Sequence, residues 1–540
     1  MKRKNIKWTG RLILIIFSLI LVLSLIFFIT KQTHKNTTEQ LLTEYMNYIN
    51  KHEYEKMYKM ISKEHSSNIS MEEFVKRNKN IYEGLETKDL SIKILSEKSN
   101  GKEISYLTSF NTLAGEVKFQ NKVNFIKEKF EYKLVWKDSI IFPQLESTDK
   151  VRIDTVEAER GQILDRNGKL LAGKGVASSV GLVPGKIQDK ENTIIKLAEL
   201  LEVDIDVIKN KLSAEWVKDD SFVPIKTIPK VSELELMKIN PDENLVKLKE
   251  NQEELLSIPG VMINDIEVRD YPLKEAASHL VGYIQKVTAE DLEENKGKGY
   301  DSNSVIGRSG IESLYEDKLK GQNGCMIYIE DEFGNRKDII VDKPVQNGED
   351  IQLTIDAELQ KVLYEQFKDD KSCSVAMNQY TGEVLALVST PSFNSNDFVM
   401  GMSDKLWKSL NEDERQPLYN RFRQVWCPGS TFKPVTAVIG LDTGILDPAE
   451  DYGNEGLSWQ KDSSWGDYYV TTLHETEPAT LEKAMIYSDN IYFAKVALKL
   501  GEDNLTSFLE KLGFNKEIPF DIKMSISQYS NTEEIGRAHV

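Results

Sequence analysis

Ser430 and Lys433 are the pair of residues in this chain whose types and spacing best suit chemistry. A serine hydroxyl is a weak nucleophile at its ordinary pKa and needs a base beside it. A lysine that has lost its proton because of burial can be that base. Residues three positions apart share one face of a helix, so the spacing predicts that the two side chains lie together. The expected chemistry is attack by the serine with a covalent intermediate.

The sequence around this pair distinguishes it from chance matches. The same spacing occurs twice in polar, turn-like sequence, at Ser99 with Lys102 and at Ser147 with Lys150. Before Ser430, in contrast, Pro428 and Gly429 break regular structure. We expect a buried helix to begin at Ser430, with apolar side chains about one turn apart at Phe432, Val435, Val438 and Ile439. Its N–H groups and dipole would favour an oxyanion.

A second motif, Ser488-Asp489-Asn490, follows 58 positions after the first serine. Ser66-Ser67-Asn68 and Ser392-Phe393-Asn394 also match Ser-x-Asn, so the triplet alone is weak. Its position is more informative, because residues 480–487 and 491–500 both have the pattern of apolar helices. Polar side chains at such a junction require hydrogen-bond partners.

Ser-x-x-Lys followed by Ser-Asp-Asn is the pattern of serine β-lactamases and penicillin-binding proteins. The chain resembles a class B penicillin-binding protein, a peptidoglycan D,D-transpeptidase. The resemblance implies that Ser430 attacks the penultimate D-alanine carbonyl of a stem peptide and that Lys433 takes its proton. It also implies that Ser488 relays a proton to the departing D-alanine, and that Asn490 binds the substrate amide and orients the lysine. β-Lactams would acylate the same serine, and no metal or cofactor is implied.

Length and composition agree with an exported multidomain protein. A chain of 540 residues predicts two to four domains, and the net charge of −17 argues against a nucleic-acid partner. The six histidines are scattered, which leaves little material for a Ser-His-Asp triad. The three cysteines are odd in number and scattered, so we expect no disulfide framework. This cysteine usage suits the outside of a Gram-positive cell.

The N-terminal sequence predicts a membrane anchor. Residues 12–29 are apolar except for two serines, a length that spans one hydrocarbon core. The preceding residues 1–11 carry five cations and no acid, which places this tail in the cytoplasm and the rest outside. No small-residue cleavage site follows, so we expect an uncleaved single-pass anchor over 12–30 rather than a signal peptide.

Two non-catalytic domains are expected after the anchor. Residues 36–146 predict a small α+β domain that begins with a capping box at Thr37 and Gln40. They resemble the cone-shaped N-terminal domain of methicillin-resistance-type penicillin-binding proteins. Residues 150–345 resemble the pedestal, or dimerisation, domain of class B proteins, through the segments 160–168, 269–272, 282–283 and 307–312 and through His279. Asn167-Gly168 predicts a turn there, and His279 is expected to be structural.

The catalytic domain is expected over residues 350–533. Resemblance implies a serine transpeptidase or β-lactamase-like α/β domain, whose central antiparallel sheet includes 374–377 and 384–388 and packs against the Ser430 helix. A Lys-Thr-Gly or Lys-Ser-Gly motif on a late strand, which would hold the second oxyanion donor, is absent. Residues 534–540 continue no family pattern and resemble a non-native tail. We therefore expect an incomplete, inactive fragment.

Two other functions remain open from sequence. A D,D-carboxypeptidase or β-lactamase would use water as the acyl acceptor, although the anchor and pedestal favour a transpeptidase. A non-catalytic cell-wall scaffold or β-lactam sensor would not need all four residues Ser430, Lys433, Ser488 and Asn490. Resemblance implies stem peptides and β-lactams as ligands, and a membrane-embedded glycan polymerase as a partner.

Overall fold

The computed structural model describes residues 37–66, 68–98, 102–129, 131–232, 236–237 and 243–530. They form two compact units, one from residues up to 160 together with 320–348, and one from 161–319 together with 349 onward. The predicted tail (1–11), anchor (12–30) and final segment (534–540) lie outside the described residues. Within the described part, no helix is both long and apolar enough to cross a membrane.

Three helices begin the first unit: α2 (Thr38–Asn50), α3 (Tyr54–Met60) and α4 (Met71–Gly84). The predicted capping box at the start of α2 is confirmed, because the Gln40 N–H donates to Thr37 Oγ1 and the Thr37 N–H donates to Gln40 Oε1. Ser70 and Glu73 form the same motif at the start of α4. The apolar side chains of α2 then point into the core, where Leu42, Tyr45 and Ile49 are buried.

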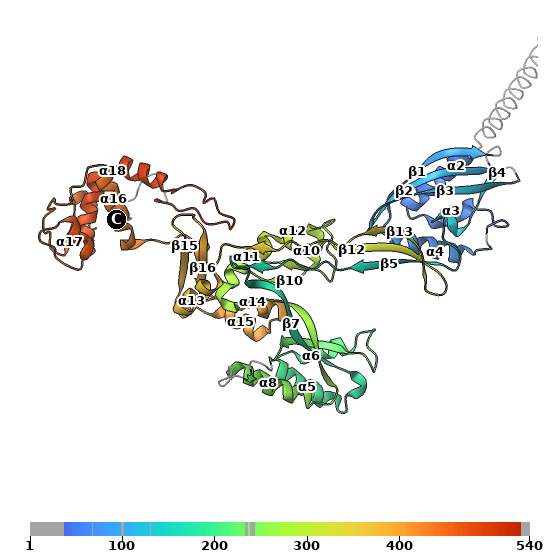
Figure 1. The fold of residues 1–540 in the computed structure, drawn as a ribbon, viewed down its shortest axis with the longest axis horizontal. Helices are drawn as coiled ribbons and strands as arrows, with labels where there is room; N and C mark the ends of the chain where they lie inside the picture. The colour runs from blue at the N-terminus through green and yellow to red at the C-terminus, as the bar shows by residue number, and fades with distance from the viewer. Residues whose placement is uncertain are drawn as a thin grey trace, which may run out of the picture. The chain divides into compact units, whose positions relative to one another are not determined.

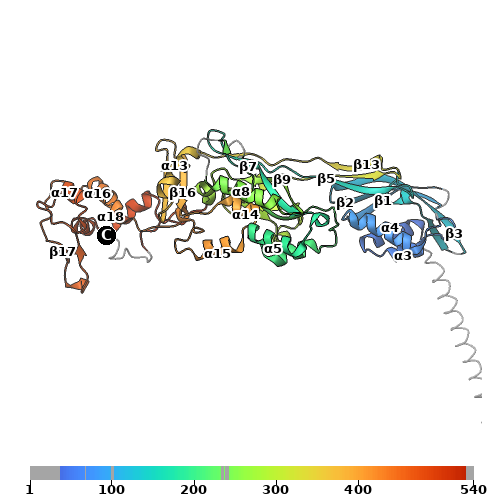
Figure 2. The same ribbon diagram turned by 90° about the horizontal axis from the view of Figure 1, so that it is seen from below.

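A four-stranded antiparallel sheet covers these helices, in the order β1 (Lys88–Lys98), β2 (Glu103–Thr112), β3 (Gly115–Glu128) and β4 (Glu131–Val135). The expected alternation is present on β3, where Val117, Val123 and Phe125 are buried. Trp136 is fully buried in the same core, edge-on to Phe74 of α4. Figure 2 shows α3 and α4 on the same side of the sheet. One face of the sheet therefore forms the core.

A second sheet completes the first unit and joins segments far apart in the sequence. Its antiparallel order is β13 (Arg336–Lys343), β12 (Gly324–Glu330), β5 (Lys150–Val156). Ile327 and Ile329 of β12 are fully buried in the same core as the helices. Residues 320–348 thus pack with the N-terminal unit, although the chain has passed through much of the second unit before reaching them.

The second unit begins with a sheet around the long strand β7 (Leu170–Leu182) (Figure 1). β7 pairs antiparallel with β6 (Ile163–Leu164), β8 (Val223–Pro229) and β9 (Val261–Asp270), and β6 pairs parallel with β14 (Ile351–Gln352). Helices α5 (Lys190–Leu201), α6 (Ile205–Leu212) and α8 (Glu243–Leu256) contribute to a core with β7 and β8. The predicted Asn167-Gly168 turn is confirmed: Gly168 has a φ of 79°, and Asp165 accepts from the Asn167 and Lys169 N–H groups.

Six short elements follow β9 in this unit: α9 (Ser278–Val281), β10 (Ile284–Lys286), α10 (Ala289–Glu294), β11 (Val305–Gly307), α11 (Gly310–Leu314) and α12 (Glu316–Leu319). A buried ion pair ties them to β9, since Arg269 Nε donates to Glu312 Oε1 at 2.8 Å. Tyr271 Oη donates to the same carboxylate at 3.1 Å. Arg269, Tyr271 and Glu312, which lie in the segments 269–272 and 307–312 named above, therefore join β9 to α11.

The C-terminal part of the second unit contains the hairpin β15 (Ser372–Met377) and β16 (Val384–Thr390), against which α13 (Ala357–Phe367) packs. Helices α14 (Ser395–Met400), α15 (Asp404–Glu412), α16 (Lys433–Asp442), α17 (Leu481–Ile486) and α18 (Asn490–Lys511) follow, with a hairpin of β17 (Ser458–Trp459) and β18 (Val470–Thr471). Gly501 interrupts α18 with non-helical backbone, directly after the helix predicted over 491–500.

Three expectations for the helix after Ser430 are corrected. The α-helix α16 begins at Lys433, and Ser430 lies in the preceding 3-10 turn η5 (Gly429–Phe432). Within the described residues, the core around α16 draws on α17 and α18 and contains no residue of β15 or β16. Ala437 and Ile439 enter that core, whereas Val438, which the sequence predicts to be buried, is 62% exposed. The predicted packing of this helix on the β15–β16 sheet is therefore wrong for the described residues.

Candidate active site

Lys433 is the centre of a polar cluster at the start of α16. Its side chain is almost fully buried, and its ammonium nitrogen reaches three acceptors. Nζ lies 2.7 Å from the backbone oxygen of Ser488, 3.0 Å from Ser488 Oγ and in a short contact with Asn490 Oδ1. Three of the four residues singled out from sequence therefore meet at one nitrogen atom.

The cluster forms because α17 ends where α18 begins. Ser488 lies between the two helices with a φ of 54°, a left-handed conformation that is uncommon for residues other than glycine. The turn directs its carbonyl and hydroxyl oxygens to the same lysine. Strained backbone of this kind persists only where the surrounding structure holds it, and it is concentrated at functional sites.

Asp489 has a structural role that the sequence motif did not reveal. It is buried and caps α18, because Oδ1 accepts from the N–H groups of Ile491 and Tyr492 at 2.9 and 3.2 Å. Its other oxygen accepts from the Thr476 hydroxyl at 2.7 Å. The middle residue of Ser-Asp-Asn thus fixes the first turn of α18 and, with it, Asn490. An Asp directly before a predicted helix is the signal that identifies such a cap.

Electrostatics at the cluster favour loss of the lysine proton. Burial lowers the pKa of Lys433 below its ordinary value, and the Asp489 carboxylate partly opposes this shift. A neutral amine has two N–H donors and one lone pair. In that state Lys433 can still donate to the Ser488 carbonyl and Asn490 Oδ1, and its contact with Ser488 Oγ can reverse so that the hydroxyl donates.

Ser430 lies one turn before the cluster and is exposed. Its backbone oxygen accepts from the Lys433 N–H, which links the 3-10 turn to α16. Gly429 precedes it with a φ of 57°, and Thr431 Oγ1 donates to the Pro428 carbonyl at 2.6 Å. Within the described structure, the Ser430 side chain forms no hydrogen bond with Lys433, Ser488 or Asn490. Ser430 and Lys433 therefore lie within one turn of each other, but their side chains are not hydrogen-bonded.

Asn490 also connects the cluster to the β17–β18 hairpin. Its Nδ2 donates to the backbone oxygen of Thr471 on β18 at 2.8 Å. Sequence reasoning did not identify Thr471, because a backbone acceptor leaves no trace in residue type. The hairpin therefore forms one side of the candidate site.

Three family models match the chain in sequence order. Residues 37–149 match the NTF2-like N-terminal transpeptidase domain, 155–353 the penicillin-binding protein dimerisation domain, and 372–540 the penicillin-binding protein transpeptidase domain. Penicillin-binding protein 3 of Bacillus subtilis is 39% identical over 509 residues, which is 92% of this chain and 73% of the relative. The chain belongs to the penicillin-binding proteins. Its domain set is that of a class B member with a methicillin-resistance-type N-terminal domain.

More distant relatives agree with this family. Peptidoglycan D,D-transpeptidase MrdA of Acinetobacter baumannii is 31% identical over 398 residues, or 73% of this chain and 56% of that protein. The Escherichia coli K12 protein of the same name is 30% identical over 72% of this chain and 60% of its own length. A solved complex of a penicillin-binding protein (PBP2) and MreC from Helicobacter pylori has a TM-score of 0.50 at 22% identity, covering 70% of this chain and 68% of that one. That likeness shows a shared fold.

Proposed function

We propose that this penicillin-binding protein is a peptidoglycan D,D-transpeptidase that cross-links stem peptides through an acyl-enzyme on Ser430. The observation that carries the proposal is the buried Lys433, bonded to Ser488 and Asn490 one turn after an exposed serine. Burial lowers the lysine pKa, which is what a general base near neutral pH requires.

In the acylation step, Ser430 Oγ bonds to the carbonyl carbon of the penultimate D-alanine. Lys433, as the neutral amine, accepts the hydroxyl proton, and the Ser430 N–H donates to the developing oxyanion. The C–N bond to the terminal D-alanine then breaks. Its nitrogen receives a proton through Ser488, whose hydroxyl lies 3.0 Å from the lysine nitrogen. The products are the ester on Ser430 and free D-alanine.

In the second step, an amine of a neighbouring stem peptide attacks the ester carbonyl. Lys433 and Ser488 take the amine proton and return one to Ser430 Oγ, so the enzyme is regenerated and one peptide cross-link is formed. Asn490 is assigned two roles: its amide oxygen orients Lys433, and its amide group binds the substrate backbone. β-Lactams would form the same ester and block the site.

The test compares Ser430 with a decoy of the same spacing. The full-length gene product, given a donor stem peptide and a labelled D-amino acid acceptor, should release D-alanine and form the exchanged peptide. Ser430→Ala should abolish both products, whereas Ser147→Ala, at an exposed Ser-x-x-Lys match outside the site, should retain them. Release of D-alanine without exchange would indicate that water is the acceptor. Activity in the Ser430→Ala protein would overturn the assignment.

We also propose that the protein is anchored in the cell membrane with its catalytic part outside. The apolar run 12–29 and the five cations before it support this orientation. Protease added to intact, wall-stripped cells should digest the chain beyond the anchor, and full protection would reverse the orientation. Membrane proteins of the cell-wall machinery, including a glycan polymerase, are the expected partners. In-cell crosslinking that captures none of them would contradict this.

A further inference from the structure

The second unit contains a cavity of about 480 Å³ that lies outside the candidate active site. Four separate parts of the chain line it: His279 of α9 with Tyr283, residues between Arg308 and Leu314, residues between Phe393 and Arg423, and the pair Ile522 and Lys523. Its size falls within the range of small-molecule sites in proteins. None of Ser430, Lys433, Ser488 and Asn490 lines it.

Aromatic rings form one wall of the cavity. Tyr283 and Phe398 stack with their centroids 3.9 Å apart, and Trp407 stands edge-on to Phe398. His279 stands edge-on to Phe393 and bonds the Pro417 carbonyl through Nε2. Burial lowers the pKa of His279 to about 4, so this ring is uncharged at neutral pH. The wall is therefore a preformed surface on which a planar apolar group can stack.

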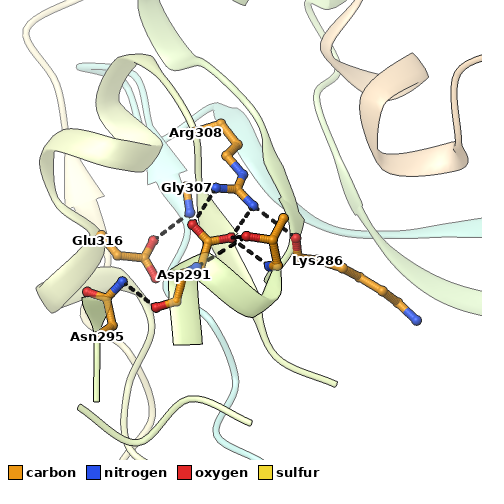
Figure 3. Close-up of polar contacts among 7 residues, drawn as sticks. Lys286, Asp291, Asn295, Gly307, Arg308 and Glu316 are labelled. Carbon is orange, nitrogen blue, oxygen red and sulfur yellow. Dashed lines mark hydrogen bonds and ion pairs between the residues drawn. The ribbon is translucent and has the colours of Figure 1, made fainter. Parts of the chain in front are cut away.

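The charged side chains that line the cavity are all cationic: Arg308, Arg423 and Lys523. Arg308 is already neutralised, because its guanidinium forms a two-pronged contact with Asp291 and a third bond to the Lys286 carbonyl, as Figure 3 shows. Arg423 Nε donates to the backbone oxygen of Lys523 at 3.0 Å. Among the residues that the structure describes, no carboxylate pairs with Arg423 or Lys523. The cavity thus presents two uncompensated positive charges in a protein of net charge −17.

We propose that this cavity binds a small organic anion with a planar apolar body, a carboxylate or a phosphate ester. The planar body would lie against Tyr283, Phe398 and Trp407, and the anionic group would meet Arg423 and Lys523. The charge pattern selects against cations, and the ring wall adds affinity for a planar apolar body that an inorganic anion lacks. Because Arg423 lies seven residues before Ser430, such a ligand would bind beside the segment that leads into the active-site turn.

Equilibrium dialysis of the full-length protein tests the proposal, with 2-naphthoate, 2-naphthyl phosphate and neutral 2-naphthamide as probes. Lys523 is exposed and its side chain has no described partner, so Lys523→Gln should fold normally. It should weaken binding of both anions by roughly fivefold and leave the amide unchanged. Lys523→Arg should restore anion binding, and Lys408→Gln, which removes an exposed charge on α15 outside the cavity, should have no effect.

A second variant tests the apolar wall independently. Trp407→Ala should weaken binding of all three probes, by roughly tenfold, because stacking area is lost whatever the charge. The relative strength of the two anions tells whether a carboxylate or a phosphate suits the site. No saturable binding of either anion, or binding equally strong in wild type, Lys523→Gln and Trp407→Ala, would overturn the proposal. Labelling of Ser430 by penicillin is a separate measurement, so either proposal can fail alone.

Discussion

Lys433 donates to the backbone carbonyl of Ser488 at 2.7 Å, although 55 positions separate the two residues. The bond joins the start of α16 to the turn between α17 and α18. Because this acceptor is a backbone oxygen, a substitution of the Ser488 side chain does not remove the acceptor atom itself. The proton chemistry assigned to Lys433 therefore depends on how α18 is held, and Asp489 holds it.

Asp489→Asn should shift the pH dependence of acylation. Acylation requires neutral Lys433, so its rate rises as pH rises through the lysine pKa. The Asp489 carboxylate raises that pKa, against the larger lowering by burial. Removing the charge should lower the pKa further and move the rising limb to lower pH. Asn remains a good helix cap, so folding should be retained. The measurement is the penicillin acylation rate against pH, and an unchanged or upward-shifted limb would contradict the account.

A matched variant separates charge from structure at the same position. Asp489→Ala also removes the charge, but it loses the cap and leaves the buried Thr476 hydroxyl without its acceptor. It should cost about 1 kcal/mol of stability or more in thermal unfolding, whereas Asp489→Asn should cost less.

Glu312→Ala should strongly destabilise the second unit. The substitution leaves Arg269 with an uncompensated charge at a site where both side chains are at most 5% exposed. Breaking a buried pair on one side costs about 3–5 kcal/mol. Glu412→Ala is the control, since its contact with Lys408 is 3.8 Å long and fully on the surface. That variant should change the free energy of unfolding by about 0.5 kcal/mol or less. Similar decreases in the free energy of unfolding for the two variants would show that the buried pair stabilises the unit no more than the surface pair does.

Gly282→Ala and Gly297→Ala compare a crowded glycine with an uncrowded one. The two glycines have similar positive φ values of 82° and 83°, and Gly282 also has a ψ of −153°, in a backbone region that is essentially restricted to glycine. A Cβ at Gly282 would lie 1.8 Å from the Ser309 carbonyl oxygen, whereas one at Gly297 meets nothing within 4 Å. We expect about 1 kcal/mol for Gly297→Ala and roughly 3 kcal/mol or more for Gly282→Ala in denaturant unfolding. Equal losses of stability would show that the backbone at Gly282 and Ser309 can move apart to accommodate a Cβ atom.

His279 should make the stability of the second unit depend on pH. Its pKa falls from 6.5 to about 4 on folding, because burial disfavours the imidazolium. A lowered pKa contributes stability above the unfolded value that is lost as pH falls through the folded value. The unfolding free energy of the wild type should therefore drop between pH 6.5 and 4 by up to about 3 kcal/mol relative to His279→Gln. Parallel profiles for the two proteins would contradict burial of this ring.

Local chemistry in the sequence predicted the features that depend on few neighbours. The capping box at Thr37 and the turn at Gly168 follow from residue type and spacing, whereas the meeting of Lys433 with Ser488 and Asn490 is what the resemblance to penicillin-binding proteins implies. Features set by distant partners were missed. The exposure of Val438 depends on which face of α16 is covered in the folded chain, and the role of Thr471 depends on a backbone oxygen. Strands β1 and β2 also escaped notice, although Leu90, Ile92 and Ile94 of β1 alternate with polar residues and face the core.

The most direct test of the central claim is to map the site of penicillin attachment. The full-length gene product is treated with benzylpenicillin and digested, and the modified peptide is sequenced by mass spectrometry. The account predicts one penicilloyl adduct, on Ser430, which is absent from Ser430→Ala and strongly reduced in Lys433→Arg because a guanidinium stays protonated. An adduct on another residue, or one that persists at wild-type level in Ser430→Ala, would contradict the assignment of the nucleophile.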